Sequence, residues 1–184
     1  DVSAQVQQTL FSNSEKGSSF KAALGFEILS GTDTGAPGDE SNSFAPLYGT
    51  NHAHNGYMDY FYVGGRWANN VGLQDSYLKL RNRFNSNFFT QLGGHVFLAQ
   101  ATPTGFVSGS LQELDPYLGT ELDFSLGYIF HPAVSLQFGY SQMFASDTFE
   151  ALSGIGEFDG RQNWAYLMFI FRPTMKNKNI GILF

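Results

Sequence analysis

The segments LGTELDFSLGYIF (118–130) and AVSLQFGYSQMF (133–144), separated only by His131 and Pro132, decide the fold class of this sequence. In both segments the even positions are almost all apolar, whereas most odd positions are small or polar. Alternation with a period of two residues is typical of a β-strand that has one apolar face. A two-residue connection allows a tight turn between antiparallel strands. The stretch therefore predicts a long β-hairpin.

The same alternation recurs along the rest of the chain. It is clear in 20–28 and 88–98, weaker in 71–84, and polar-rich in 1–11. The segment 162–172 (QNWAYLMFIFR) is apolar at both odd and even positions, so the pattern predicts a strand without deciding which side faces which medium. In total the sequence predicts seven long strands.

The connections between these strands alternate strictly in length. Short connections at 12–17, 85–87 and 131–132 are interleaved with long ones at 31–70, 102–117 and 147–160. Transmembrane β-barrels have short turns on the periplasmic side and longer loops outside. The strands of about 11–14 residues are long enough to cross a bilayer at a tilt. We therefore predict an all-β fold, an antiparallel transmembrane β-barrel over residues 1–173, followed by a tail at 174–184.

The composition agrees with a barrel and excludes several other classes. Only 14% of residues are charged and 16% are aromatic, against about 25% charged in ordinary soluble domains. A net charge of −6 argues against a nucleic-acid partner. The mean hydropathy of −0.17 suits strands of which only one side meets lipid. We expect outer-membrane lipid as a partner, a bacterial outer-membrane location and no cofactor.

Seven strands conflict with the even strand number of bacterial single-chain barrels. An open sheet in lipid leaves backbone groups unpaired, each at several kcal/mol. Either the chain is the C-terminal part of a longer barrel, completed by missing N-terminal strands or a partner chain, or the 31–70 region adds a strand. The segment 57–63 (YMDYFYV) is the candidate for that strand. We favour the first alternative.

Three cationic residues, Lys79, Arg81 and Arg83, alternate along one predicted strand and so share a face. In a barrel this face is the lumen, because Lys or Arg facing lipid near the midplane costs about 2–4 kcal/mol. A basic ladder there would attract an anionic solute. Alternatively, the three cations lie near the membrane surface and pair with acidic residues or lipid phosphate. The other predicted pore-lining residues are Gln91, His95, Glu121 and Asp123.

The segment LYGTNHAHNGYMDYF (47–61) is dense in polar and aromatic residues. We predict that it folds on its own hydrogen bonds and reaches into the pore, which it narrows. Its candidate constricting residues are Asn51, His52, His54 and Asp59. No third metal ligand accompanies the two histidines at a suitable spacing, so we predict no metal site.

The sequence contains no motif of a known catalytic constellation, such as G-x-S-x-G, a P-loop or H-E-x-x-H. We therefore predict a channel that passes a solute and not an enzyme. The alternatives are a structural outer-membrane barrel that anchors or scaffolds partner proteins and a soluble lipid-binding barrel. Several aromatic residues near strand ends fit either an interfacial girdle or ordinary packing. They are Tyr128, Phe130, Phe144, Trp164 and Tyr166.

Four segments also carry a family resemblance: ALGFEILSGTD (23–33), FAPLYGTNHAHNGYMDYFYVG (44–64), NVGLQDSYL (70–78) and NWAYLMFIFRP (163–173). They resemble the C-terminal half of alginate-export-type outer-membrane porins of the Bacteroidetes kind. The resemblance implies a monomeric porin-like barrel of about 18 strands, within the even-numbered range of such barrels. It also implies passage of an anionic polysaccharide or a related small or polymeric solute.

Overall fold

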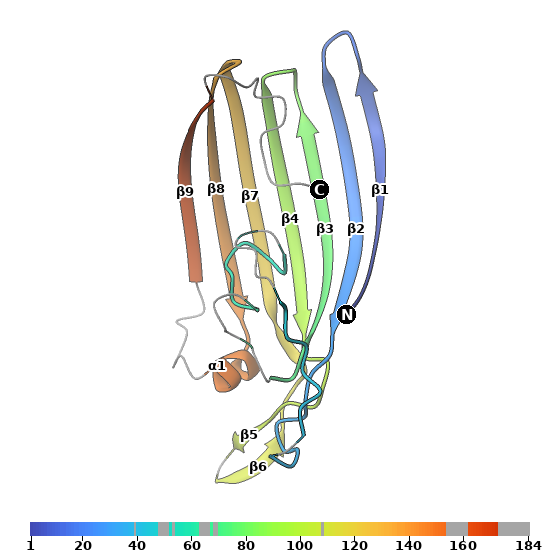
Figure 1. Cartoon of the computed structure of the whole chain (residues 1–184), viewed down its shortest axis with the longest axis vertical. Coiled ribbons are helices and arrows are strands. Elements are labelled where there is room, and N and C mark those ends of the chain that lie inside the picture. Colours follow the sequence, from blue (N-terminus) through green and yellow to red (C-terminus); the bar gives the residue numbers. More distant parts are fainter. Residues whose placement is uncertain are drawn as a thin grey trace.

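The computed structural model describes residues 1–38, 40–47, 52, 54–62, 67, 70–107, 109–153 and 162–172. Seven long strands form one antiparallel sheet in the order β1-β2-β3-β4-β7-β8-β9 (Figure 1). The strands are β1 (Val2–Asn13), β2 (Ser18–Leu29), β3 (Leu73–Arg83), β4 (Phe88–Leu98), β7 (Tyr117–His131), β8 (Val134–Ala145) and β9 (Gln162–Phe171). The predicted all-β, antiparallel fold class is confirmed, and all seven predicted strands are present.

The predicted alternation of connections is confirmed as well. Residues 14–17, 84–87 and 132–133 form the short turns at the top of Figure 1, and the long connections lie at the other end of the sheet. We call these two ends of the sheet the turn end and the loop end. Neighbouring strands run antiparallel, and the three short turns all lie at one end of the sheet. Every long connection therefore begins and ends at the opposite end.

Two of the long connections contain structure that the sequence patterns did not predict. The hairpin of β5 (Thr104–Val107) and β6 (Ser110–Glu113) projects from the loop end, and the short helix α1 (Asp147–Ser153) packs near β7. The proposed extra strand at 57–63 is wrong for the described residues 57–62, which form no strand. Asp59 and Tyr62 there have left-handed backbones, with φ of 57° and 56°, and such residues cannot continue a pleated strand.

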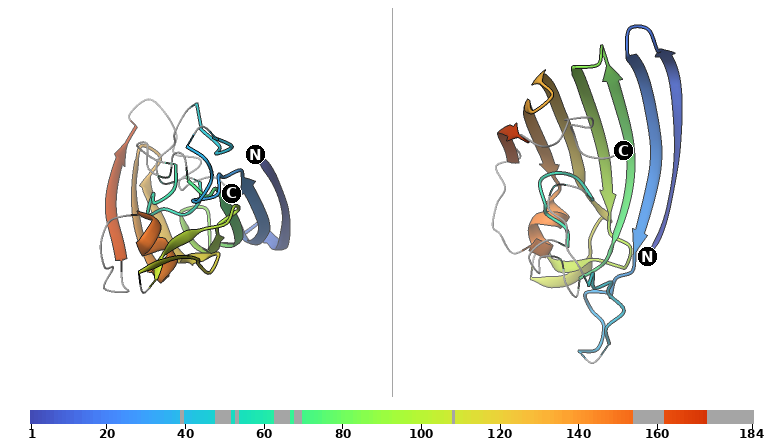
Figure 2. Two further views of the ribbon diagram at one scale, coloured as in Figure 1. Left: turned by 90° about the horizontal axis from the view of Figure 1, so that it is seen from below. Right: turned by 45° about the horizontal axis from the view of Figure 1, so that its top comes forward.

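The sheet does not close on itself in the part of the chain that the structure describes. Strands β1 and β9 are its two edges and do not pair with each other. Seen along the strands, the sheet curves into a trough that is open between these edges (Figure 2, left). The seven strands therefore do not form a closed barrel on their own. Of the predicted barrel, the structure shows a curved antiparallel sheet.

The two faces of the trough have opposite chemistry. In a sheet, directly paired residues share a face, so the register assigns each side chain to one side. The convex face exposes large apolar side chains, among them Leu24, Leu78, Leu92, Val96, Leu122, Phe144 and Leu167. The concave face buries polar ones, namely Asp75, Gln91, His95, Glu121, Asp123, Ser125, Ser135, Gln137 and Ser141. This is the reverse of a soluble sheet that packs on an apolar core.

The register also settles the orientation of β9, which its sequence left open. Leu167 pairs with Phe138 and Phe169 with Leu136, so the odd residues of β9 lie on the convex face. Trp164 and Tyr166 pair with Ser141 and Gly139 and face the trough. Trp164 and Tyr166 therefore do not belong to an aromatic girdle on the outward face, which was one of the two predicted roles for them.

The apolar core cluster of the described residues lies at the loop end. There the connection that follows β2 and helix α1 pack against the ends of the strands, and aromatic rings meet edge to face. The cluster consists of Leu29, Phe61, Trp67, Val71, Leu73, Phe97, Ala99, Leu118, Met143 and Phe149. The only described helix, α1, has seven residues, and no described helix is long and apolar enough to cross a membrane.

Candidate functional site on the concave face

The candidate site is the concave face together with the loop that lies in it (Figure 2). Small residues on this face make room for larger ones on neighbouring strands. A Cβ on Gly25 would lie 2.5 Å from the Tyr77 ring, and one on Gly139 would lie 2.0 Å from the Tyr166 ring. The glycines therefore allow the two tyrosines to lie flat along the trough and leave its centre to polar groups.

A buried acidic cluster occupies the loop-end half of the trough. The His95 Nδ1 atom lies 2.9 Å and 3.0 Å from the two carboxylate oxygens of Asp75. The opposite ring atom, Nε2, lies 3.8 Å from Asp123 Oδ2, which is too far for a direct hydrogen bond. All three side chains are at most 3% exposed. The histidine is therefore held between two carboxylates from different strands, β3 and β7.

The loop that follows β2 covers this cluster and binds its carboxylates. Asn55 Nδ2 donates hydrogen bonds to Glu27 Oε2 at 2.7 Å and, more weakly, to Asp75 Oδ2 at 3.4 Å. The backbone N–H groups of Tyr57 and Met58 both donate to Glu121 Oε1, the latter at 2.8 Å. We call residues 55–58 the latch, because they connect the loop to β2, β3 and β7 at once.

The latch requires a left-handed backbone. Asn55 and Gly56 have φ values of 53° and 84°, and Asn and Gly are the two residues that adopt this conformation most readily. A Cβ on Gly56 would lie 2.6 Å from the carboxylate carbon and oxygens of Glu121. Glycine is therefore required at this position both by its backbone and by the close approach of Glu121.

The Tyr57 side chain extends the contact toward the centre of the trough. Its hydroxyl accepts a hydrogen bond of 3.0 Å from Gln91 Nε2. Burial raises the pKa of this hydroxyl far above its ordinary value, and the nearby charge of Asp123 raises it further. The hydroxyl therefore stays neutral at any ordinary pH, and Gln91, a predicted pore-lining residue, is tied to the loop.

The predicted self-contained hydrogen bonding of the 47–61 loop is present among its described residues. His52 Nδ1 lies 2.8 Å from both Asp59 Oδ2 and the Tyr57 carbonyl oxygen, and the His52 backbone N–H donates to Asp59 Oδ1. The His52 ring also stacks on Trp164 of β9, with ring centroids 4.2 Å apart. His54 is exposed, and Asn51 lies outside the described residues. The loop is thus held between the two sides of the trough.

The cationic residues occupy the turn-end half of the trough. Lys79, Arg81 and Arg83 share the concave face, as predicted, and Lys21 joins them because it pairs with Arg81 across β2 and β3. Two of the cations lie over aromatic rings, Lys79 over Tyr77 at 4.8 Å and Arg81 over Phe89 at 4.5 Å. All four are only half-buried, unlike the acidic cluster. The basic ladder therefore faces the part of the trough that the described loop residues leave open.

Sequence reasoning placed all seven predicted pore-lining residues on one face, and the structure confirms that common placement. The sequence also places Glu27 on this face, but it does not identify the loop residues that connect to the sheet, namely Asn55, Gly56, Tyr57 and Met58. The Asn55-Gly56 dipeptide was the available signal, because this pair marks a turn with left-handed residues. No pattern in the sequence identifies Glu121, 63 positions after Met58, as the acceptor for the backbone N–H groups that follow this turn.

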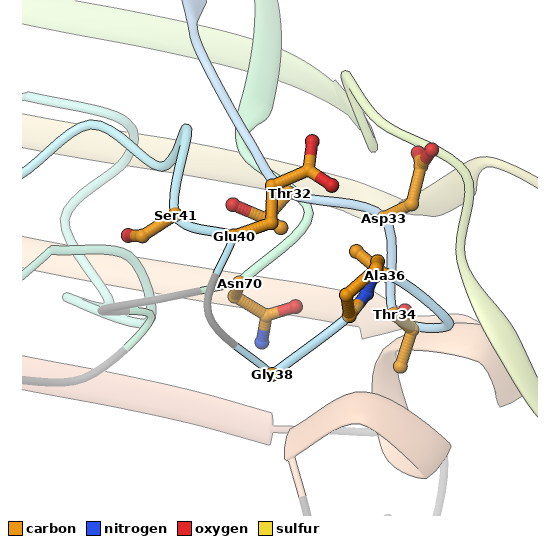
Figure 3. A pocket seen from close by; sticks show the side chains of 9 residues that line it. Thr32, Asp33, Thr34, Ala36, Gly38, Glu40, Ser41 and Asn70 are labelled. Atoms are coloured by element: carbon orange, nitrogen blue, oxygen red, sulfur yellow. The ribbon is translucent and has the colours of Figure 1, made fainter.

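A separate cavity of about 410 Å³ lies in the first part of the connection between β2 and β3, outside the trough (Figure 3). Its carboxylates are already engaged locally. Asp33 Oδ1 accepts a hydrogen bond from the Thr102 backbone, and Glu40 Oε1 accepts one from Asn42 Nδ2. Among the described residues, no group of three or more His, Asp or Glu side chains is placed to hold a metal ion.

Comparisons of the chain with protein-family models, with curated proteins and with solved structures found no match. The features of this chain that bear on its function are therefore the two faces of the sheet, the latch and the basic ladder.

Proposed function

We propose that the chain forms part of the wall of a bacterial outer-membrane β-barrel and that this barrel passes a solute. The observation that carries the proposal is the apolar, exposed convex face opposite a polar, buried concave face. In water, a continuous apolar surface of this kind is unfavourable and marks contact with another apolar phase. In a membrane barrel the outward residues meet lipid and the inward residues are polar.

Strand length and aromatic placement support the same proposal. The seven strands have 10–15 residues, whereas about 9–11 tilted residues span a bilayer. Near the turn end, Phe84, Phe88, Tyr128 and Phe130 form a chain of ring contacts, with successive centroids 4.8–6.3 Å apart. Aromatic side chains gather at the membrane–water interface. This row therefore suits the periplasmic boundary of the membrane.

The proposal requires further strands at the open edges of the sheet, because unpaired backbone groups in lipid cost several kcal/mol each. Strands β1 and β9 run in the same direction, since an odd number of antiparallel strands separates the two edges (Figure 1). An odd number of additional strands between them would keep every pair antiparallel. These strands belong either to the same polypeptide or to a partner chain.

The basic ladder supports an anionic solute, such as an acidic polysaccharide. Lys21, Lys79, Arg81 and Arg83 face the open half of the trough, whereas the carboxylates Asp75, Glu121 and Asp123 are buried under the loop. A passing anion would therefore meet the cations first. Cationic side chains focused in a concave surface raise the local concentration of anions and their entry rate.

A second candidate is a structural barrel that anchors or scaffolds partner proteins without conducting. It is favoured by the latch and by the apolar core cluster, which together fill the loop end of the trough. Small barrels whose interior is filled by side chains do not leave an aqueous channel. Conductance separates the two candidates.

The test combines extraction with planar-bilayer recording of the protein from its native membrane. Release only by detergent, followed by stepwise anion-preferring conductance, is the expected result. Release only by detergent without conductance would favour the structural barrel. Purification as a stable monomer without detergent would contradict the membrane proposal altogether.

A further inference from the structure

The charged side chains of the concave face are divided along the trough. Four carboxylates and His95 lie toward the loop end and four cations toward the turn end, and the two groups meet where Lys79 and Asp123 both pair with Gly93. They are Glu27, Asp75, Glu121 and Asp123 on one side and Lys21, Lys79, Arg81 and Arg83 on the other. The formal charges of the two groups cancel. A trough lined equally by both groups would have little preference for anions.

The latch changes this balance, because three of the four carboxylates are buried beneath the loop, while Glu27 stays half-buried like the cations. Glu121 is fully buried and Asp75 and Asp123 are 2% and 3% exposed, whereas the four cations are all half-buried. Two of the four carboxylates, Glu27 and Glu121, accept hydrogen bonds from latch residues at normal distances. The latch therefore withdraws negative charge from the open surface without adding a positive charge of its own.

We propose that residues 55–58 act as a selectivity latch, which makes the channel prefer anions by covering its carboxylates. When the latch is bound, a solute meets the four cations of the basic ladder and, of the four carboxylates, the half-buried Glu27. When the latch is released, Asp75, Glu121 and Asp123 face the same aqueous path and cancel the attraction of the cations. The inference deepens the proposed channel function and rests on it, because it assigns the charge selectivity of that channel to one short segment.

Gly56 offers a way to open the latch without changing any charge. In Gly56→Ala the new Cβ meets the Glu121 carboxylate at 2.6 Å. If the carboxylate moves away, it leaves the N–H groups of Tyr57 and Met58, and if the loop moves away, the same hydrogen bonds break. Gly109→Ala is the matched control, because Gly109 also has a φ of 84° but nothing lies within 4 Å of its Cβ position.

The first arm of the experiment measures the latch itself and does not depend on conductance. The chain has no cysteine, so Ser141→Cys provides a single thiol beside Asp123 on the buried concave face. We expect Gly56→Ala to speed its reaction with a small cationic thiol reagent about tenfold, the change that corresponds to the loss of one buried hydrogen bond. The cationic reagent should gain more than an anionic reagent of the same size. Gly109→Ala should leave both rates unchanged.

The second arm measures the chloride-to-potassium permeability ratio from reversal potentials in a salt gradient. We expect Gly56→Ala to lower this ratio about threefold, the size of effect that a few uncovered charges have through water. Asp123→Asn should have little effect when the latch is bound and should restore the ratio in the Gly56→Ala background. Such non-additivity is expected only if the latch controls the exposure of that carboxylate.

The two arms separate the possible failures. Faster labelling of Ser141→Cys in Gly56→Ala with an unchanged permeability ratio would overturn the selectivity latch and leave the channel intact. Equal labelling in Gly56→Ala, Gly109→Ala and the parent protein would also overturn it, because the covered face would not depend on residues 55–58. Absence of conductance in every variant would instead overturn the proposed channel, and with it the selectivity assigned to the latch.

Discussion

The convex and concave faces of the sheet are built by the same strands, one residue apart, yet they are buried in opposite ways. On β7, Glu121 is fully buried and its neighbour Leu122 is 50% exposed. On β4, Gln91 is 3% exposed and Leu92 is 53% exposed. A soluble protein places such residues the other way round, because apolar burial is the main favourable term in folding. The comparison therefore supports the proposal that the convex face lies against an apolar medium.

The largest expected effect comes from placing a charge on the convex face. Leu92→Arg should lower the free energy of unfolding in lipid vesicles by about 2–4 kcal/mol if Leu92 lies near the bilayer midplane. Denaturant titration of the reconstituted protein measures the change. Gln7→Arg, at an exposed position of the concave face, is the control for the added side chain. A Leu92→Arg variant as stable as its parent would remove the distinction between the faces.

A smaller effect is expected on the concave face at Glu121. Glu121→Ala removes the acceptor shared by the Tyr57 and Met58 backbone N–H groups. The loop should lose about 1–3 kcal/mol, the cost of leaving buried donors without an acceptor. Hydrogen exchange of these two amides should accelerate while exchange in β7 and β8 stays slow. Glu121→Gln, which keeps an acceptor oxygen, should show a weaker effect, and equal exchange in all three proteins would contradict the latch.

Packing within the trough provides the next test. Gly139→Ala places a Cβ 2.0 Å from the Tyr166 ring on the adjacent strand. We expect a loss of about 1–3 kcal/mol, as for other overpacked sites, measured by thermal or chemical unfolding. Tyr166→Ala in the same chain should recover part of the loss, since it removes the clashing ring. Failure of the second substitution to compensate would mean that Tyr166 does not lie over Gly139.

The smallest effect on stability is expected at the basic ladder. Arg81→Gln removes the cation that lies over the Phe89 ring, a contact worth about 0.5–1 kcal/mol. Anion preference in bilayers should fall, whereas Arg81→Lys should retain most of it. An unchanged permeability ratio in Arg81→Gln would separate the ladder from the solute path.

Strand positions and facing could be predicted from the sequence because they follow from a local, period-two pattern. The hairpin of β7 and β8, the position of every long connection and the common face of Lys79, Arg81 and Arg83 were all accessible in this way. The orientation of β9 was not, because its own residues are apolar on both sides and only pairing with β8 decides it. The odd strand number was a correct warning that the seven strands leave two open edges.

The latch lay beyond sequence reasoning for a different reason. Its hydrogen bonds join residues 28 and 63 positions apart, and its backbone is left-handed at positions that no strand pattern covers. The missing strand makes the segment 57–63 a candidate from the sequence, and its Tyr, Phe and Val residues favour strands. Tertiary contacts override that preference, because Phe61 packs into the apolar core cluster and the backbone N–H groups of Tyr57 and Met58 bind Glu121.

The most direct test of the two-face account compares adjacent residues of β3 in the reconstituted protein. Single cysteines at Leu78, which is 46% exposed on the convex face, and at Lys79, on the concave face, would carry the same nitroxide label. We predict that molecular oxygen, which concentrates in the bilayer, relaxes the label at Leu78→Cys. A water-soluble nickel complex should relax the label at Lys79→Cys instead. Strong relaxation of the Leu78→Cys label by the nickel complex would place the convex face in water and contradict the account.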